Sequence, residues 1–347
     1  MPQRPIDADL QDELIRRFGL VRGALEDLTI ERRRRGKGFS YHHGQQLLRR
    51  ERDIARIAQL AIPPAWSQVR IAPLPELHLQ ALGKSPTDRL QYLYHPRWSD
   101  IRETLKFERL KRFASALPGI RRTVRRDLRA RTLSPDFMCA AAIRLIDETN
   151  IRVGSWVHNE QTGTRGATTL LTSDIDEGPG RSVALSFRAK GGKEAERQID
   201  DNTLARILHK LADLPGRYLF DVTLDGDRFR LTAGQLNAYL RAAGGAAVSA
   251  KDFRTFAASS QALAELAPIA PPASQRARQR QIMDVARQVA ARLGNTPAMA
   301  KNSYIHRSIL ERWEKGQLSE RLIRGRRRAE LSREETALAR FLDEFDT

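Results

Sequence analysis

Residues 91–119 read QYLYHPRWSDIRETLKFERLKRFASALPG, and the character of the chain changes within this stretch. Its first four residues end a region of short apolar runs broken by proline and glycine, which is typical of antiparallel strands. After His95-Pro96, apolar residues recur at helical spacing up to Leu117, and Pro118-Gly119 predicts the end of that helix. We therefore expect the chain to pass from a β-rich domain to a helical one near residue 98.

The N-terminal side, residues 1–98, is predicted to form a small β-rich domain. Its apolar runs and one helix-forming stretch predict three strands and a short helix, at residues 69–71, 78–82, 91–94 and 53–58. Apolar residues at helical spacing from Leu10 to Leu25 predict an opening helical segment. The run RRRRGKG at residues 32–38 is interpreted as a loop or basic arm.

The C-terminal side, residues 99–347, is predicted to be mostly helical. Further helices are expected at residues 121–131, 134–150, 202–212, 232–243, 249–266 and 276–293. Strand-like runs at 168–172 and 182–187 interrupt them, and Lys190-Gly191-Gly192-Lys193 predicts a hairpin tip. The predicted fold class is therefore α+β, with a small β-rich N-terminal domain followed by a large, mostly α-helical domain that contains a small β-hairpin sheet.

The charge balance of the chain indicates a polyanionic partner. Its 347 residues contain 60 Lys and Arg against 42 Asp and Glu, a formal net charge of +18. Between residues 102 and 131, eleven basic residues are opposed by three acidic ones, and their many guanidinium groups favour nucleic-acid phosphate over a membrane surface. The single cysteine, Cys139, excludes an internal disulfide framework. Without an apolar run of ~18 residues or the apolar core of a signal peptide, a cytoplasmic protein is expected.

The sequence argues against ATP and gives little support for a metal. No phosphate-binding glycine loop of the Walker type is present. The acidic groups at residues 174–177 and 225–227 could hold magnesium for a nuclease, but both fall where turns are expected, and solvated turns explain them better. Phosphoryl transfer without a metal must meet the charge on the non-bridging oxygens with arginine, lysine or amide donors, and it needs an oxygen nucleophile.

Four places in the helical half supply groups of this kind. The first two carry Arg152 at a helix end and Lys190 at the hairpin tip, where Lys193 is a rival lysine. The others are the helix opening around Arg254, and the Gly-Asn-Thr-Pro turn at residues 294–297, which a tyrosine follows one short helix later. Taken singly, each of these residues is more often a surface, ion-pair or core residue than a catalytic one.

In this order, Arg152, Lys190, Arg254, Asn295 and Tyr304 resemble the active site of the type IB DNA topoisomerases, in particular the bacterial branch related to the poxvirus enzyme. Other segments similar to that branch lie at residues 56–66, 78–81, 91–98, 106–110, 116–118 and 251–255. The resemblance implies the catalytic fold that these enzymes share with the tyrosine recombinases.

The resemblance also implies a role for each residue. Tyr304 would attack the scissile phosphate, giving a 3′-phosphotyrosyl link and a free 5′-hydroxyl. Arg152 and Arg254 would hold the non-bridging oxygens, and Lys190 would donate a proton to the leaving 5′-oxygen. Asn295, where many relatives carry histidine, would donate a hydrogen bond only. Because religation reverses the cleavage step, no ATP, metal or other cofactor is implied.

The implied partner is duplex DNA, gripped mainly through its phosphates by a monomer whose two domains close around it. In the poxvirus relative, the segment matching residues 89–94 contacts the major groove, which makes Gln91, Tyr92 and Tyr94 candidates for DNA binding. Lys251 is a further candidate. A plain strand with two buried rings explains the tyrosines equally well. The implied location is the bacterial nucleoid.

Three positions depart from the family pattern. Ala189 replaces the glycine that commonly precedes the lysine, residues 83–89 differ from the usual Gly-Arg-Asp-rich form, and Arg307 stands where relatives often have proline. His306 is a conceivable base two residues after the tyrosine, but a surface or structural role is favoured. None of these departures removes a catalytic group.

Two alternatives stay open. A tyrosine recombinase uses the same phosphotyrosine chemistry, but it usually carries His-x-x-Arg in one box, where Lys251 precedes Arg254 here. A DNA-binding protein with a decayed site is the other alternative, and the five intact positions argue against it.

Overall fold

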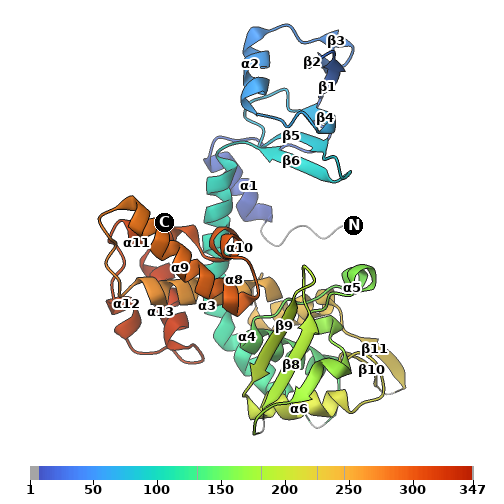
Figure 1. The fold of residues 1–347 in the computed structure, drawn as a ribbon, viewed down its shortest axis with the longest axis vertical. Helices are drawn as coiled ribbons and strands as arrows, with labels where there is room; N and C mark the ends of the chain where they lie inside the picture. Colours follow the sequence, from blue (N-terminus) through green and yellow to red (C-terminus); the bar gives the residue numbers. More distant parts are fainter. Residues whose placement is uncertain (1–7, 131, 181, 225, 246, 346–347) are drawn as a thin grey trace. The chain divides into compact units, whose positions relative to one another are not determined.

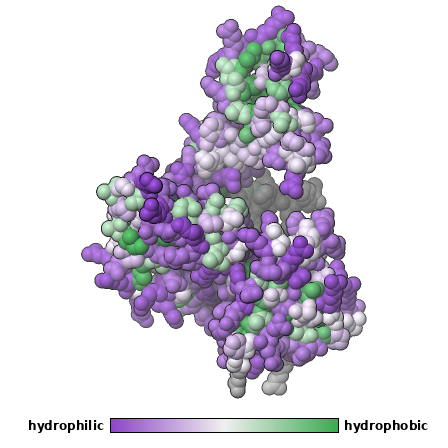
Figure 2. All heavy atoms as spheres, viewed as in Figure 1, coloured by the Kyte–Doolittle hydropathy of each residue, from purple (hydrophilic) through white to green (hydrophobic). Residues whose placement is uncertain are grey.

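The computed structural model describes residues 8–130, 132–180, 182–224, 226–245 and 247–345. The chain forms two compact units, Met1–Leu105 and Lys106–Thr347. The first is built on a β-sheet and the second is mainly helical (Figure 1), which confirms the predicted α+β class. Hydrophilic side chains prevail on the face of each unit that Figure 2 shows. No helix formed by the described residues combines the length and the apolar character that crossing a membrane requires.

The first unit contains, within its described residues, an antiparallel six-stranded sheet in the order β3-β2-β1-β4-β5-β6. Its elements are α1 (Ala8–Arg17), β1 (Ile30–Arg35), β2 (Gly38–His43), β3 (Gln46–Leu47), α2 (Glu51–Gln59), β4 (Ser67–Ile71), β5 (Leu79–Lys84) and β6 (Leu90–Tyr94). The three predicted strands and the short helix at residues 53–58 are confirmed. The last predicted strand, β6, lies at an edge of the sheet.

The opening helix is shorter than predicted. Gly19 ends it with a φ of 68°, and the N–H of Leu20 bonds the Ile15 carbonyl at 2.9 Å, as at many helix ends that carry glycine. Val21 then forms a bridge with Leu77 and is 52% exposed instead of continuing the buried helical face. The apolar spacing continued beyond the glycine, which is why the pattern overestimated the helix.

The basic run is a β-hairpin and not a loop or arm. Residues 32–35 belong to β1, and a two-residue turn at Gly36-Lys37 leads into β2. Arg32 points inward, where it donates to the Trp66 carbonyl at 2.6 Å and its Cζ lies 4.1 Å from the centre of the Phe39 ring. The prediction of a loop or arm was wrong. The Trp66 carbonyl that Arg32 binds is 34 residues away in the sequence, so the run itself does not show that one of its arginines points inward.

The second unit places its core around two helices that are buried along most of their length, α4 and α8. Its longer helices before the candidate tyrosine are α3 (Trp98–Asp127, which begins in the first unit), α4 (Pro135–Thr149), α5 (Trp156–Thr162), α6 (Asn202–Ala212), α7 (Ala233–Gly244), α8 (Ala250–Leu266) and α9 (Gln275–Leu293). Beyond it lie α11 (Arg307–Glu314), α12 (Arg321–Arg324) and α13 (Arg333–Glu344). Sequence analysis did not identify α5 or these last three helices.

Helix α3 corrects the predicted break at Pro118. The proline lies inside one continuous helix instead of separating two, although it lacks the N–H that the helical ladder needs. Leu117, Ile120 and Val124 are all buried on one side of the helix across this point. We attribute the continuity to this packing, which outweighs one missing hydrogen bond.

Two small sheets complete the described part of the second unit. They are β7-β8-β9 (Ile175–Glu177, Val183–Arg188 and Glu194–Ile199) and the hairpin β10-β11 (Asp221–Leu224 and Asp227–Arg230). The strand predicted at 168–172 was wrong, since Ala167–Thr169 and Thr172–Asp174 form 3-10 turns. The N–H and the hydroxyl of Thr168 both donate to the Val153 carbonyl, at 2.7 and 3.0 Å, so this segment is bonded to the loop after α4 and not to a neighbouring strand.

Candidate active site

Arg152 lies in the loop that follows α4. The helix ends at Thr149, and Asn150 turns the chain out of it in the left-handed conformation, with φ 56°. The loop is then held from outside, because the N–H of Ala167 donates to the Arg152 carbonyl at 2.8 Å. The backbone of Arg152 is thus fixed while its side chain remains partly exposed.

Two glycines allow this loop to pack closely against the chain that follows α5. Gly154 has a φ of 94°, a backbone conformation that residues with a side chain rarely adopt. At Gly166, a Cβ atom would lie 2.6 Å from the Arg152 carbonyl oxygen, which is closer than real Cβ contacts. The position of Arg152 therefore depends on glycine at residue 166.

Arg254 projects from α8 and is 3% exposed. One Nη donates to the Asn150 carbonyl, and the other donates to the Leu293 carbonyl at 3.0 Å, so the guanidinium joins the ends of α4 and α9. Its Nε finds no partner among the described residues. Burial lowers the pKa of Arg254, and the charge of Arg152 acts in the same direction, but a guanidinium remains protonated in a protein.

Asn295 follows the end of α9. Gly294 closes the helix with φ 61°, and the N–H of Asn295 bonds the Ala290 carbonyl at 2.9 Å. Its side-chain oxygen accepts a hydrogen bond from Arg152, which fixes the orientation of the amide. The amide nitrogen is buried and has no partner among the described residues. A hydrogen-bond donor is therefore left available beside Arg152.

Tyr304 ends a π-helical turn, Ala300–Tyr304, that follows the short helix α10 (Pro297–Met299). Its backbone is fixed to α8, because the Ser259 hydroxyl donates to the Tyr304 carbonyl at 3.2 Å and accepts from the N–H of His306 at 3.1 Å. The Tyr304 ring lies with its centre 5.0 Å from Cζ of Arg254. Ser259 thus connects the tyrosine to the helix that carries Arg254.

The structure brings Arg152, Arg254, Asn295 and Tyr304 together. Burial opposes ionisation of the Tyr304 hydroxyl, but the positive charge of Arg254, with a smaller contribution from the charge of Arg152, outweighs it and lowers the pKa of the tyrosine. The cluster can therefore stabilise a phenolate, and by the same physics it can stabilise other anionic oxygens.

Lys190 forms no hydrogen bond with these four residues in the described part of the chain. It lies exposed at the tip of the β8–β9 hairpin, as does Lys193. The turn is closed by the N–H of Gly192, which donates to the Ala189 carbonyl at 3.0 Å, and Gly191 has a φ of 85°. The predicted hairpin tip is confirmed, and alanine at residue 189 is compatible with the turn.

His306 is buried and has a structural use. Its Nδ1 accepts from the N–H of Ser308 at 3.2 Å and so caps the start of α11. Its ring packs edge-on against Phe107, with centres 5.4 Å apart. These contacts agree with the structural role that the sequence favoured.

The tyrosines of β6 are not buried. Tyr92 and Tyr94 are each 40% exposed, and their rings stack with centres 6.3 Å apart. Gln91 is half-buried at the alternate position of the strand. Lys251, in the second unit, is exposed in the first turn of α8. The interpretation of β6 as a plain strand with two buried rings was therefore wrong.

Of the acidic groups considered for magnesium, Asp174 has a structural role. Asp174 is buried, accepts from the N–H of Leu171 at 2.9 Å and pairs with Arg165 at 2.8 Å. Residue 225 lies outside the described residues. Within the described ranges, no group of three or more His, Cys, Asp or Glu side chains is arranged to hold a metal ion.

Sequence reasoning missed the residues that hold the cluster in place. Gly166 and Ser259 act through backbone contacts, and Arg197 of β9 donates to the carbonyls at the ends of α4 and α9. No motif marks these positions, because each is defined by a partner that is distant in sequence.

Comparison with known proteins identifies the family of the chain. The family described as eukaryotic DNA topoisomerase I, catalytic core, matches residues 97–324, and the bacterial DNA topoisomerase IB N-terminal domain matches residues 38–84. The chain is 28% identical to DNA topoisomerase 1B of Acanthamoeba polyphaga mimivirus over 271 residues, which are 76% of this chain and 80% of the viral protein. A solved structure of the XerH site-specific recombinase on palindromic difH substrate gives a TM-score of 0.35 at 14% identity, covering 56% of this chain and 49% of the recombinase.

The catalytic-core match covers most of the second unit, so the chain belongs to the DNA topoisomerase I family. Within that family it is an enzyme of type IB, and its N-terminal part is of the bacterial kind.

Proposed function

We propose that this enzyme relaxes supercoiled duplex DNA by cleaving one strand through Tyr304, allowing rotation, and rejoining the strand. The observation that supports this assignment best is the cluster of Arg152, Arg254 and Asn295 around the tyrosine. It collects two guanidinium groups and an unused amide donor, and the described residues place no carboxylate among them. The positive charge of such a site is not balanced by a protein carboxylate, and the phosphodiester of a bound DNA strand would supply the negative charge.

Cleavage then follows from the roles of the side chains. The Tyr304 oxygen attacks phosphorus and loses its proton, the bond from phosphorus to the 5′-oxygen breaks, and the strand is held as a 3′-phosphotyrosine. The Arg152 and Arg254 guanidinium groups and the Asn295 amide meet the charge on the non-bridging oxygens. The reverse attack by the 5′-hydroxyl restores the phosphodiester, so the cycle is balanced without ATP or a metal ion.

Lys190 is proposed as the acid that protonates the leaving 5′-oxygen. An exposed lysine at a hairpin tip is suited to reach a bound strand, and the ammonium group can supply the proton that the alkoxide needs. Lys193, at the other end of the same turn, is the residue to compare with it. We expect Lys190→Ala to reduce cleavage far more than Lys193→Ala.

The DNA is proposed to be held through its phosphates, as the net charge of +18 favours. Gln91, Tyr92 and Tyr94 of β6, together with Lys251 of α8, are the proposed DNA-binding residues. The exposure of the two rings supports this role, since a buried pair would have no surface to offer. We further propose that the enzyme acts as a monomer on the bacterial nucleoid, with no membrane and no small-molecule cofactor.

Relaxation of a supercoiled plasmid by the pure protein, with EDTA present and ATP absent, tests this function. We expect stepwise relaxation by the wild type and none by Tyr304→Phe. The control is Tyr41→Phe, which removes a hydroxyl in the other unit and is expected to relax the plasmid at the wild-type rate. If wild type binds the plasmid but leaves it supercoiled, a recombinase or a non-catalytic DNA-binding protein becomes the better assignment.

A further inference from the structure

Arg197 of β9 is a half-buried arginine whose donors are used by backbone carbonyls. Its Nε donates to the Thr149 carbonyl at 3.3 Å, its Nη2 to the Arg292 carbonyl at 3.1 Å, and its Nη1 to the neighbouring Glu196 carbonyl at 2.6 Å. Among the described residues it has no carboxylate partner. Burial lowers the pKa of its guanidinium, but an arginine remains protonated in a protein, so an uncompensated cation is retained at this point.

The two distant acceptors are the last turns of α4 and α9. Carbonyl groups at a helix C-terminus are left without helical partners and carry partial negative charge, so a cation there is stabilising. Each helix end leads within three residues to a member of the cluster, since Thr149 precedes Arg152 and Arg292 precedes Asn295. The side chains of these two members are hydrogen-bonded to each other.

A second feature links Arg197 to the lysine hairpin. Residue 197 pairs with Leu185 in the β8–β9 ladder, and the same two strands continue to the tip that carries Lys190. A displacement of Arg197 relative to the helix ends would therefore change the position of the hairpin relative to Arg152 and Asn295. Arg197 lies where the three segments of the proposed active site are joined.

Arg254 and Arg197 have complementary positions at these helix ends. Arg254 joins the same two helices through the carbonyls of Asn150 and Leu293. Each of these residues directly follows the residue whose carbonyl Arg197 binds, and Arg254 also faces Tyr304. The charge of Arg197 also lowers the pKa of Arg254, so the two cations lie close enough to interact. Among the described residues Arg197 forms no hydrogen bond with Tyr304, and the cation over the tyrosine ring is Arg254.

We infer that Arg197 is a positioning residue for strand cleavage: it joins the lysine hairpin to the helix ends that carry Arg152 and Asn295 and does not itself bind the scissile phosphate. This inference rests on the function proposed for those residues. Misplacement of reacting groups by about 1 Å can cost about 100-fold in rate, so removing such a joint slows chemistry while leaving DNA affinity largely intact.

The experiment compares Arg197→Ala, Arg197→Lys and Arg197→Gln with the control Arg206→Ala. Arg206 of α6 is exposed and makes only a local bond to its own helix, so the control removes an equal charge from the same unit. Three quantities are measured at a temperature where every variant is folded: the rate of covalent-complex formation at saturating plasmid, the Kd for DNA in a Tyr304→Phe background, and the Tm.

We expect Arg197→Ala to slow covalent-complex formation by about 10- to 100-fold while the Kd changes less than about threefold. Arg197→Lys keeps the charge but reaches fewer carbonyls, and Arg197→Gln keeps one amide donor without the charge. Partial recovery by lysine that exceeds recovery by glutamine supports the combined electrostatic and geometric role. Arg206→Ala is expected to match the wild type.

A loss of Tm with a cleavage rate within twofold of the wild type would show that Arg197 is merely structural and would overturn the inference. A parallel loss of cleavage and of DNA affinity would also overturn it, because Arg197 would then contact DNA directly. Failure of the proposed function would be recognised separately. In that case the wild type would form no covalent complex, or Tyr304→Phe would form it as fast as the wild type, and both results are independent of Arg197.

Discussion

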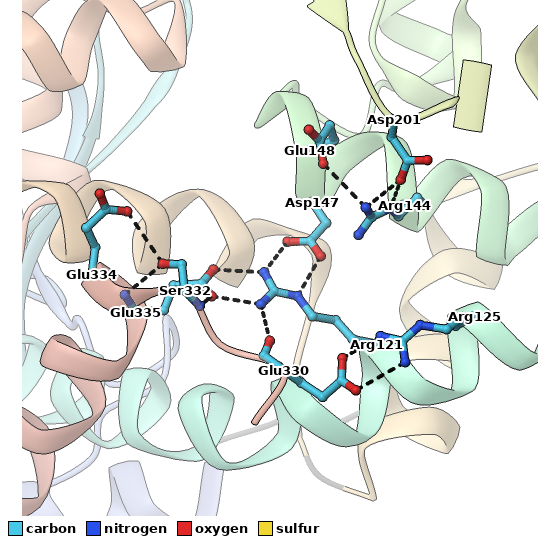
Figure 3. A network of polar contacts seen from close by, with 10 residues as sticks. All are labelled: Arg121, Arg125, Arg144, Asp147, Glu148, Asp201, Glu330, Ser332, Glu334 and Glu335. Atoms are coloured by element: carbon cyan, nitrogen blue, oxygen red, sulfur yellow. Dashed lines mark hydrogen bonds and ion pairs between the residues drawn. The ribbon is translucent and has the colours of Figure 1, made fainter. Parts of the chain in front are cut away.

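Two arginines in the helical unit, the partly buried Arg121 and the buried Arg254, are surrounded in opposite ways. Arg121 of α3 donates to both oxygens of Asp147 at 2.8 Å, and to the two oxygens of Glu335 at 2.7 and 2.8 Å (Figure 3). Arg254 of α8 donates instead to two backbone carbonyls, and the described residues offer it no carboxylate. One guanidinium is thus enclosed by two anions, and the other is held only by dipoles.

The difference has an electrostatic consequence. Burial disfavours the charged form of both side chains, but the hydrogen bonds that Arg121 donates to Asp147 and Glu335 outweigh it and raise the pKa of Arg121, whereas burial lowers the pKa of Arg254. An arginine between two carboxylates has no net charge left for a ligand. The comparison teaches that counter-ions, and not burial, distinguish a structural arginine from one that can receive a phosphate.

The neutralised cluster nevertheless supports the charged one. Figure 3 shows Arg121 between Asp147 on α4 and Glu335 in the segment that forms α13, with Glu330 beside Arg125. Helix α13 in turn packs against α8, which carries Arg254. The C-terminal segment therefore has a structural role, because it packs against the helix that carries Arg254.

The largest expected effect comes from breaking the neutralised cluster. Arg121→Ala leaves two partly buried carboxylates without their cation, and removing one partner of such a group costs about 3–5 kcal/mol. We expect a loss of that size in the free energy of unfolding, measured by urea denaturation. At a temperature where the variant is folded, plasmid relaxation should continue at close to the wild-type rate.

Arg125→Ala is the matched control for that experiment. Arg125 pairs with Glu330 next to Arg121, but its side chain is 54% exposed, and exposed pairs contribute about 0–1 kcal/mol. If both variants lose the same small amount of stability, the ion pairs of Arg121 with Asp147 and Glu335 do not stabilise the packing of α3, α4 and α13 as the structure indicates.

The second effect comes from breaking the uncompensated cluster. Removing one donor to a developing oxyanion typically costs about 10²- to 10³-fold in rate, so we expect Arg254→Ala to slow covalent-complex formation by that factor. Arg254→Lys keeps a point charge without the planar fork and should recover only part of the rate. The comparison is wrong if Arg254→Ala, while folded, cleaves within threefold of the wild type.

The contrast between these two arginines was not predictable from the sequence. Arg254 was found because Lys251–Thr255 resembles a known motif, and Arg121 was noted only as one of eleven basic residues in a stripe. The carboxylates that separate their roles, Asp147 and Glu335, lie 26 and 214 residues from Arg121. Periodicity and local spacing carry no information about such pairs.

Local patterns were more informative about elements than about their limits. Strands β4 to β6 and helices α4 and α6 to α9 follow from periodicity and caps, such as the Gly294 that ends α9. The errors occurred where packing or backbone bonds overrode the pattern, as at Pro118 inside α3 and at the 3-10 turns of Ala167–Thr169. Four of the five predicted catalytic residues meet in space, and Lys190 lies on its hairpin without a hydrogen bond to them.

The third prediction concerns the acidity of Tyr304. Its pKa is lowered mainly by Arg254, with help from Arg152, whereas partial burial raises the pKa of Tyr94 and burial raises the pKa of Tyr239. Tyr304 should therefore ionise at lower pH than the other two, and Arg152→Ala should move its ionisation to higher pH. Tyrosinate absorbance near 295 nm, taken as the difference between each protein and its Tyr304→Phe counterpart, measures this without DNA.

That titration has a clear contrary outcome. If Tyr304 ionises with or after Tyr94, or if Arg152→Ala leaves its midpoint unchanged, the cluster does not stabilise a phenolate. The proposed activation of the nucleophile would then fail, even if the family assignment stands.

The smallest expected effect separates binding from chemistry. Lys251 opens α8 one turn before Arg254, yet it is exposed and has no ion-pair partner among the described residues, so it is free to meet a phosphate outside the cluster. Each phosphate contact contributes about 0.9 to the slope of log Kobs against log salt. We expect Lys251→Gln to reduce that slope by about one, with little change in the rate of cleavage at saturating DNA. Lys210→Gln, an exposed lysine in the last turn of α6, is the control; an equal loss of slope in both variants would mean that Lys251 adds only to the general charge of the surface.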